Sequence, residues 1–257
     1  MHPAITSRAN ERVKHARCLA TSAAQRAEEG LLFAEGLRLC LDLAQRLRAR
    51  AAFFTQAMVG AHPEVAQLAP EAYLVSDGVA QKLGDTQTPQ GLFCLFEMPP
   101  LGLPAISAAG GVLLCEQMAD PANVGTLVRS AAGLGLGGVV FTPGSADVFS
   151  PKALRASMGA VGRVPLAVCP LDEALAHLRA AGATVYAAAL EGARPFYEVR
   201  AGGAFALMVG NEGAGLSAGA LAAADERLCI PMHGGVESLN AAAAATALMS
   251  YLKHPQA

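Results

Sequence analysis

Short apolar runs alternate with helical stretches through the C-terminal part of the chain. Five runs have the length and composition of buried strands, at residues 111–115, 138–141, 184–188, 205–209 and 227–230. Between and after them, the apolar spacing predicts helices over 124–134, 151–158, 171–181 and 239–252. Because strands that alternate with helices build parallel sheets, we expect an α/β domain with a doubly wound, largely parallel sheet.

The N-terminal part of the chain predicts a second, smaller α/β unit. Its expected strands lie at 30–33, 51–54 and 91–96, and the first two flank a helix over 37–48. Pro99, Pro100 and Pro104 follow, and they forbid a regular helix or a central strand. We therefore expect one domain over residues 1–98, a Pro-rich linker over 99–105 and a second domain over 106–257.

The composition favours a globular cytoplasmic protein. Of the 257 residues 53% are hydrophobic, but every long apolar stretch is interrupted well short of the roughly 18 residues that a transmembrane helix needs. The six cysteines are scattered without a CxxC pair, and the N-terminus lacks the apolar core of a secretory signal. None of the six histidines stands at metal-ligand spacing from a cysteine or carboxylate. We therefore expect reduced thiols, no membrane association and no metal site.

Charge is unevenly distributed along the chain. The formal net charge is −2, which argues against a strongly basic nucleic-acid binder, yet residues 1–50 hold nine Lys or Arg against five Asp or Glu. Basic side chains gathered in one segment can neutralise RNA phosphates. A solvated helical face explains the same pattern, so charge alone leaves both interpretations open.

Three segments of the predicted second domain combine glycine or proline with short polar or charged side chains, as in loops that approach a ligand. Residues 120–131 contain Asn123 and, six positions later, Arg129, both expected to face the mouth of a site. Residues 209–217 place Glu212 among glycines, where a carboxylate is well placed to hold a loop or an RNA group. Residues 230–240 bring Ser238 and Asn240 to the start of the last helix.

Each of these features also has a purely structural explanation. The glycines at 210, 213 and 215 could form only a turn, and Ser238 could serve only as a helix N-cap. Arg129 could be a surface residue. Its neighbours Val128 and Ala131, however, predict a partly buried helix, where an unpaired charge is costly and a phosphate partner would compensate for it.

In order and content, the three segments resemble the signature motifs of the SpoU branch of the SPOUT methyltransferases, which methylate ribose 2'-hydroxyls of RNA with S-adenosylmethionine. Residues 150–160 resemble the segment that such enzymes carry after their second strand. Residues 33–38 and 87–91 resemble parts of the ribosomal-protein-like RNA-binding domain that precedes many SpoU catalytic domains. The resemblance implies structured RNA as substrate, with ribosomal RNA favoured over transfer RNA. It also implies a C-terminal deep trefoil knot and a homodimer in which each site lies close to the partner subunit.

The resemblance assigns roles to individual residues. Those expected to bind S-adenosylmethionine, largely through main-chain atoms, are Gly210, Gly215, Ile230, Met232 and Leu239. Those expected to act in catalysis are Asn123, Arg129, Glu212, Ser238 and Asn240. We favour a role for Arg129 in polarising the hydroxyl over a role as base, because a guanidinium is essentially never neutral. Lys152 and Arg155, three positions apart on one predicted helix, would contact RNA phosphates unless they form a solvated face.

Other functions remain open at the level of sequence. One is a non-catalytic RNA-binding or assembly protein of the same fold, and another is a base methyltransferase from a different SPOUT branch. A third is a nicotinamide oxidoreductase, because Gly133–Gly138 satisfies the GxGxxG pattern. These glycines are predicted to end a helix and lead into the strand at Val139, whereas a dinucleotide fingerprint follows a strand and opens a helix.

Overall fold

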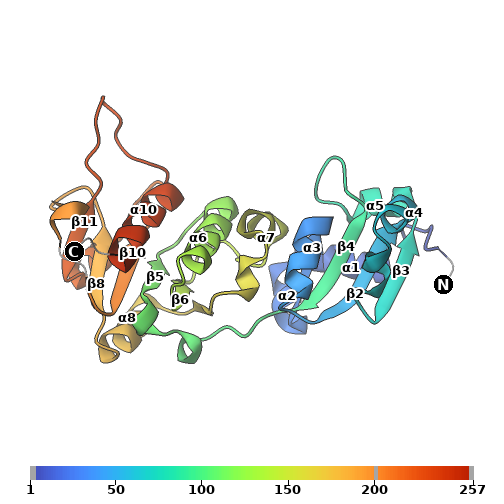
Figure 1. Ribbon diagram of the computed structural model, residues 1–257, viewed down its shortest axis with the longest axis horizontal. Helices are drawn as coiled ribbons and strands as arrows, with labels where there is room; N and C mark the ends of the chain where they lie inside the picture. Colours follow the sequence, from blue (N-terminus) through green and yellow to red (C-terminus); the bar gives the residue numbers. More distant parts are fainter. Residues whose placement is uncertain (1–3, 200–201, 255–257) are drawn as a thin grey trace. The chain divides into compact units, whose positions relative to one another are not determined.

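The computed structural model describes residues 4–199 and 202–254, and the chain forms two compact units (Figure 1). Unit 1 contains the residues up to Pro99 together with Asp147–Gly162, and unit 2 contains Pro100–Ala146 and the residues from Arg163 onward. The chain therefore passes between the units three times. No helix in the described ranges is long and apolar enough to cross a membrane.

Unit 1 is built on a mixed sheet whose described strands lie in the order β1-β4-β2-β3. They are β1 (Leu31–Glu35), β2 (Ala49–Thr55), β3 (Glu71–Val75) and β4 (Leu92–Glu97). On one face, Phe33, Phe53 and Phe93 pack against α1 (Glu11–Thr21) and α5 (Asp77–Leu83). Helix α3 (Leu37–Ala44) contacts β4, and α7 (Pro151–Ser157) contacts β1. Two further helices are α2 (Ala23–Glu29) and α4 (Gln56–Ala61).

The predicted strands at 30–33, 51–54 and 91–96 correspond to β1, β2 and β4. The helix predicted over 37–48 is too long, because α3 ends at Ala44 and the Arg48 carbonyl already accepts a hydrogen bond from the Glu97 N–H of β4. Pairing with a neighbouring strand outweighs helix propensity there. The edge strand β3 was missed because most of its residues are only half-buried, which leaves no apolar run.

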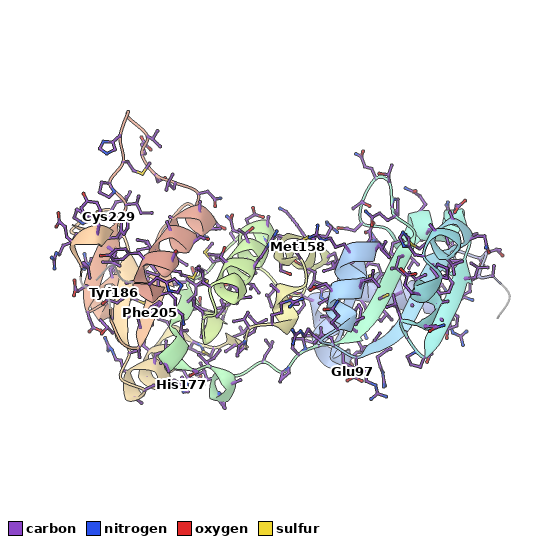
Figure 2. The ribbon with its side chains drawn as sticks, viewed as in Figure 1. Glu97, Met158, His177, Tyr186, Phe205 and Cys229 are labelled. Atoms are coloured by element: carbon purple, nitrogen blue, oxygen red, sulfur yellow. The ribbon has the colours of Figure 1, made fainter. Side chains whose placement is uncertain are left out.

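Unit 2 is built on a sheet in which every described pair of strands is parallel, in the order β7-β6-β5-β10-β8-β11-β9. The strands are β5 (Val112–Cys115), β6 (Gly138–Phe141), β7 (Leu166–Val168), β8 (Thr184–Ala188), β9 (Arg194–Pro195), β10 (Phe205–Val209) and β11 (Glu226–Cys229). Tyr186, Phe205 and Cys229, labelled in Figure 2, mark the neighbouring strands β8, β10 and β11. The five predicted strands are confirmed, and the short β7 and β9 add to them.

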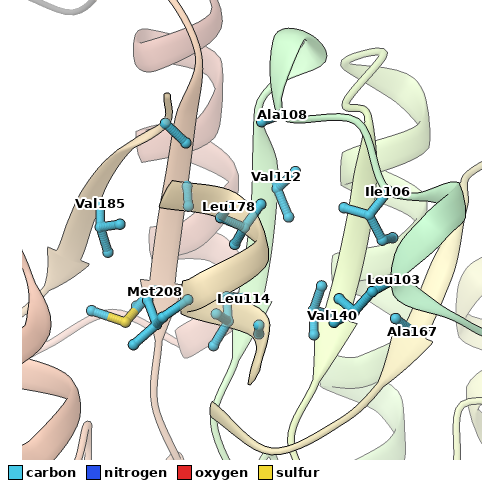
Figure 3. Close-up of a cluster of buried hydrophobic side chains, with 14 of the residues drawn as sticks. Leu103, Ile106, Ala108, Val112, Leu114, Val140, Ala167, Leu178, Val185 and Met208 are labelled. Carbon is cyan, nitrogen blue, oxygen red and sulfur yellow. The ribbon is translucent and has the colours of Figure 1, made fainter. Parts of the chain in front are cut away.

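Helices cover both faces of this sheet. Leu178 of α8 (Leu171–Ala180) packs on one face, in a buried cluster with Val112, Val140 and Met208 (Figure 3). The alternate residues of the strands, such as Leu113 and Leu207, are fully buried as well. Their side is covered by α6 (Pro121–Gly133) and α10 (Ala241–Lys253), which contact each other, and α10 also contacts β10. The predicted fold class, an α/β protein with a parallel sheet, is confirmed, and the trefoil knot stays a prediction.

The glycines at 133–138 form a helix end. Helix α6 ends at Gly133, Gly135 takes the left-handed conformation with φ of +66°, and β6 begins at Gly138. A helix followed by a strand is the reverse of the order that a dinucleotide fingerprint requires. The expected helix-ending role is confirmed, and this part of the argument for an oxidoreductase is lost.

The Pro-rich segment after β4 is bound to unit 2. Gly102 donates a backbone hydrogen bond to the Leu166 carbonyl of β7. Leu103 is buried in the same hydrophobic cluster as Leu178 of α8. Prolines exclude a regular helix or strand, but a neighbouring apolar residue can still pack into a core. The composition of 99–105 alone did not reveal this packing.

Residues 147–162, expected within the second domain, pack with unit 1. Arg26 is 4% exposed. Its guanidinium donates through Nε to Asp147 (2.9 Å) and through Nη1 to the Leu19 carbonyl (2.6 Å). At the other side of α7, Arg155 pairs with Asp85 at 2.9 Å, and both of these side chains are about one-third exposed. A largely buried pair therefore holds the start of the segment, and a half-buried pair holds α7.

We expect these two pairs to differ in their contribution to stability. Asp147→Asn leaves the buried Arg26 charge without its counterion and should lower the free energy of unfolding of unit 1 by about 3 kcal/mol. Asp85→Asn removes the more exposed pair and should cost less, about 1 kcal/mol or below. Urea denaturation of the full chain measures both values, and equal losses in the two variants would contradict the assignment.

Candidate active site

A cavity of about 480 Å³ lies at the carboxyl ends of β8, β10 and β11. Its walls come from the residues that end or follow these strands, and the first turns of α10 contribute Ala241, Ala244 and Leu248. In parallel α/β sheets, ligands bind outside the carboxyl ends of the strands. Most of the lining is alanine, leucine and glycine, so we call this the apolar cavity.

All five residues predicted to bind the cofactor line the apolar cavity, namely Gly210, Gly215, Ile230, Met232 and Leu239. They come from two loops, one after β10 and one after β11. The structure therefore brings together residues that are up to 29 positions apart in the chain. Their individual roles remain predictions.

The loop after β10, residues 210–217, has little room for side chains at its start. A Cβ atom on Gly210 would lie 2.2 Å from the Gly215 carbonyl carbon. The two ends of the loop are this close because Asn211 and Gly215 exchange backbone hydrogen bonds of 3.0 and 2.8 Å. Any residue larger than glycine at position 210 would have to open this turn.

A second depression adjoins the apolar cavity, and we call it the polar pocket. It is lined by residues that precede or begin α6, namely Ala119, Asp120, Pro121 and Asn123, and by Asn240. It shares four lining residues with the apolar cavity, which are Glu212, Ser238, Leu239 and Ala241. The two spaces therefore meet along these shared residues.

Glu212 ties the loop after β10 to the start of α6. Its Oε2 accepts the Ala119 N–H at 2.9 Å, and its Oε1 accepts the Asp120 N–H at 3.1 Å and the Asn123 Nδ2 at 2.9 Å. Both carboxylate oxygens thus receive hydrogen bonds from a segment about 90 residues earlier in the chain. Hydrogen bonds to an ionised acceptor are among the stronger ones in proteins.

Asn123 extends this hydrogen-bond network to the start of the last helix, α10. It is 9% exposed, and its Oδ1 accepts a hydrogen bond of 3.0 Å from Asn240 Nδ2. Asn240 is the N-cap of α10, because its Oδ1 accepts the N–H groups of Ala242 and Ala243. The capping role proposed as an alternative for Ser238 therefore belongs to Asn240, whereas Ser238 is exposed and lines both spaces.

The hydrogen bonds around Glu212 change its acidity. Burial acts to raise the pKa of the carboxyl, but the hydrogen bonds from Asn123, from Ala119 and from its own and the Asp120 backbone N–H outweigh it, so the pKa is lowered. Nearby, burial and the Glu212 charge raise the pKa of the Cys115 thiol well above its usual range. Glu212 is consequently ionised and Cys115 protonated near neutral pH, so Cys115 is not a nucleophile.

Arg129 lies apart from this cluster. Its side chain is exposed on α6, and it lines neither the apolar cavity nor the polar pocket. Six residues of α-helix turn through about 600°, so Asn123 and Arg129 point to different faces of α6. The expected burial, which required a phosphate partner, is therefore absent, because Val128 and Ala131 occupy the inward face.

The two residues predicted to contact RNA phosphates both belong to unit 1. Lys152 is exposed on α7, while Arg155 is half-buried and paired with Asp85. Sequence spacing placed them on one helix correctly, but it did not reveal the acidic partner of Arg155, which lies 70 positions earlier.

Asn211 is a functional candidate that the sequence pattern did not single out. Its Oδ1 accepts the N–H groups of Gly213 and Ala214, and its Nδ2 donates to the Gln117 carbonyl at 2.9 Å. An Asn before a glycine-rich stretch is a local signal for such a turn. The contact with Gln117, however, depends on the pairing of β5 with β10.

Comparison with known proteins indicates the family of the chain. Residues 111–251 match the SpoU rRNA Methylase family, and residues 10–94 match the MRM3-like substrate binding domain. The 23S rRNA (guanosine(2553)-2'-O)-methyltransferase RlmP of Bacillus subtilis is 37% identical over 71% of this chain and 73% of its own length.

Solved structures extend the likeness to almost the full chain. An AdoMet-bound rRNA methyltransferase from Sinorhizobium meliloti aligns with a TM-score of 0.85 at 26% identity, covering 97% of this chain and 96% of that one. The SpoU methyltransferase AviRb from Streptomyces viridochromogenes, in complex with AdoMet, aligns with a TM-score of 0.85 at 26% identity, covering 95% and 97%. The chain belongs to the SpoU rRNA methylase family, and the resemblance drawn from its motifs is confirmed.

The lowered pKa of Glu212 predicts how pH affects its hydrogen bonds. A carboxyl whose pKa is lowered by folding stabilises the protein above its ordinary pKa, here 4.5, and loses this contribution as pH falls through the lowered value. The difference in unfolding free energy between wild type and Glu212→Gln should stay constant from about pH 5 to 8 and shrink below about 4.5. Urea denaturation across this range measures it. A difference that disappears near neutral pH would contradict the assignment.

Proposed function

We propose that this protein transfers the methyl group of S-adenosylmethionine to a ribose 2'-hydroxyl of ribosomal RNA, in the cytoplasm. The observation that carries the proposal is the junction of an apolar cavity with a polar pocket along Glu212, Ser238, Leu239 and Ala241. The B. subtilis relative is named for the same reaction on 23S rRNA, and the S. meliloti and S. viridochromogenes structures contain AdoMet. Ribosomal RNA therefore has more support than transfer RNA.

The residues of the apolar cavity fit the proposed cofactor. Its volume of about 480 Å³ lies within the roughly 300–1,000 Å³ of small-molecule sites. The apolar walls suit the adenine ring and the methionine chain, and the carboxylates of Glu191 and Glu212 complement the positive charge of a sulfonium. When bound, S-adenosylmethionine supplies an electrophilic methyl group. Gly210, Gly215, Ile230, Met232 and Leu239 would hold it.

The polar pocket supplies groups that can hold a ribose. Asn123, Ser238 and Asn240 offer hydrogen bonds to hydroxyls, and Ser238 and Leu239 also reach the apolar cavity. Methyl transfer needs the attacking oxygen in line with the bond that breaks, so fixing the ribose against the cofactor is the main contribution of the protein. The ribose oxygen would take the methyl carbon from the cofactor sulfur, and the hydroxyl proton would pass to solvent water.

Glu212 fits a structural role, holding the loop after β10 in place, better than the role of a general base. Its two oxygens already accept hydrogen bonds from three N–H groups, and its pKa is lowered, so it takes up a proton poorly near neutral pH. Its contribution to catalysis would be to keep the loop after β10 against the start of α6. Both spaces depend on that arrangement because Glu212 lines both.

The exposed position of Arg129 supports assembly as a homodimer. An exposed guanidinium on α6 can polarise a ribose hydroxyl or hold a phosphate at a site completed by a second subunit. The neighbouring helix α10 exposes Ala243 and Ala247, whose small side chains allow close approach of another helix. We include in this proposal the trefoil knot, formed by the segment around β11 and the loop that follows it.

Unit 1 carries exposed positive charge suited to RNA phosphates, in addition to Lys152. Arg46 and Arg48 are exposed in the turn between α3 and β2, and Arg50 is exposed at the start of β2. Arg48 and Arg50 approach a single carboxylate, Glu97, at 3.7 and 3.3 Å. Arg155, in contrast, is engaged by Asp85. The excess of guanidinium groups leaves net positive charge at this turn, and a polyanion would complement it.

The reaction is tested with purified protein, labelled S-adenosylmethionine and total RNA digested to nucleosides. Wild type should produce labelled 2'-O-methylnucleosides. Gly210→Ala should bind the cofactor at least about tenfold more weakly, because the added Cβ meets the Gly215 backbone at 2.2 Å. Gly219→Ala is the matched control, since its Cβ meets only Ser217 Oγ at 3.8 Å and Gly219 lines neither space.

Two results would reject the proposal in different ways. RNA binding without cofactor binding would favour a non-catalytic RNA-binding protein of the same fold. Label in the bases rather than in the riboses would move the chain to a base-modifying activity.

The turn between α3 and β2 is tested by the salt dependence of binding to an rRNA fragment. If these arginines contact phosphates, the slope of log K against log salt concentration should become shallower by roughly 0.7–0.9 for each arginine replaced by alanine. Lys14→Ala is the control, because this exposed lysine of the same unit is paired with Glu11 at 2.7 Å. Unchanged slopes in the arginine variants would remove this turn from the RNA-binding surface.

A further inference from the structure

Glu116 is a buried carboxylate that lines neither the apolar cavity nor the polar pocket. It follows the last residue of β5, is 8% exposed and donates its backbone N–H to the Val209 carbonyl at 2.8 Å. A buried carboxylate is retained only where hydrogen bonds compensate for lost water. Its partners therefore indicate what it holds in place.

Both oxygens of Glu116 are used by one residue, Ser217. Oε2 accepts the Ser217 N–H and Oε1 accepts the Ser217 hydroxyl, each at 2.7 Å. Ser217 is in turn the N-cap of α9 (Ala218–Ala223), where its Oγ accepts the Ala220 N–H at 3.1 Å. The carboxylate therefore fixes the point at which the loop after β10 ends and α9 begins.

The next residue, Gln117, holds the opposite end of the same loop. Its carbonyl accepts Asn211 Nδ2, and its own N–H is held by Thr142 Oγ1 at 2.9 Å. Gln117 has a φ of +51°, a conformation that non-glycine residues rarely adopt. Two consecutive residues after β5 thus fasten Asn211 and Ser217, the two ends of a six-position span.

The loop that these contacts hold forms one wall of the apolar cavity. Gly210 through Leu216 all line it, and the segment is rich in glycine and mostly exposed. A glycine-rich segment loses much conformational freedom when it is held in one shape, so fixing its ends before a ligand arrives lowers the cost of binding. Glu212, next to Asn211, holds the beginning of the loop against the start of α6, and Glu116 holds its end at Ser217.

We propose that Glu116 is a positioning residue for cofactor binding, acting through Ser217 on the wall formed by residues 210–216. This inference rests on the proposed function, because it assigns the apolar cavity to S-adenosylmethionine. Glu116 touches neither the cofactor nor the ribose, so its replacement weakens cofactor binding and leaves the chemical step intact. Affinity falls equally for S-adenosylmethionine and for the product S-adenosylhomocysteine, since both contact the same wall of the cavity.

The test is Glu116→Gln, which keeps the size of the side chain but places an amide NH2 against one of the two Ser217 donors. We expect the Kd and KM for S-adenosylmethionine to rise about tenfold, kcat at saturation to stay within about twofold, and the Kd for S-adenosylhomocysteine to rise by the same factor. Ser217→Ala removes one of the two contacts and provides a milder variant if Glu116→Gln folds poorly. Its Kd should rise less, and adding it to Glu116→Gln should have little further effect.

Asp225→Asn is the control for a merely structural role, at a more exposed carboxylate that also accepts a backbone N–H. Its Oδ2 accepts the Val185 N–H at 2.8 Å near the start of β8, at the edge of the sheet opposite the apolar cavity. This variant should lose thermal stability without changing the Kd for the cofactor. If both carboxylate variants raise the Kd equally, or if Glu116→Gln lowers kcat at unchanged KM, the positioning role is overturned.

Calorimetric titration separates this inference from the proposed function. Wild type that binds no S-adenosylmethionine would reject the proposed function itself. Equal Kd values of wild type and Glu116→Gln for S-adenosylmethionine would reject only the role of Glu116. Increased hydrogen exchange of the backbone amides of residues 213–217 in Glu116→Gln, but not in Asp225→Asn, is the expected accompanying change.

Discussion

The parallel pairing of β5 with β10 is the constraint on which the candidate site depends. Cys115 lies beside Val209 in this register, so the segments that follow the two strands emerge at the same edge of the sheet, although they are more than 90 residues apart in the chain. Turns at strand ends leave backbone N–H and C=O groups that need hydrogen-bond partners. Asn211 and Glu212 on one segment, and Glu116 and Gln117 on the other, satisfy that need across the gap.

The carboxylates at this edge have different surroundings and different tasks. Glu212 is exposed at the boundary of two ligand spaces, and its hydrogen bonds outweigh burial and lower its pKa. Glu116 is buried behind the loop after β10, and both of its oxygens accept hydrogen bonds from Ser217. The lowered pKa of Glu212 makes this carboxylate a poor proton acceptor near neutral pH. That agrees with methyl transfer as a reaction in which positioning matters more than acid–base chemistry.

The connection between β6 and β7 limits how the chain can be divided. Residues 147–162 leave unit 2, pack with unit 1 and return, and the buried Arg26–Asp147 pair holds them there. Cutting the chain in the Pro-rich segment would therefore leave α7 without the sheet of unit 1 that it contacts. The Pro-rich segment, for its part, is bound to β7 and is not a free tether.

The sequence by itself determined the elements whose cause is local. Buried parallel strands read as continuous apolar runs, and β5, β6, β8, β10 and β11 were found for that reason. The glycine-rich, polar segments that form the two ligand spaces could also be picked out, although the same residue types form ordinary turns, so their resemblance to the family motifs was needed to read them as a site.

Only the tertiary structure decided which of these residues meet. Asn123 and Glu212 come together because two strands pair, whereas Arg129 points away because six residues of helix separate it from Asn123 by roughly two-thirds of a turn. The burial of Glu116 and the pairing of Arg155 with Asp85 likewise depend on partners 70 or more positions distant. Local pattern carries no information on such contacts, because they follow from strand order and packing.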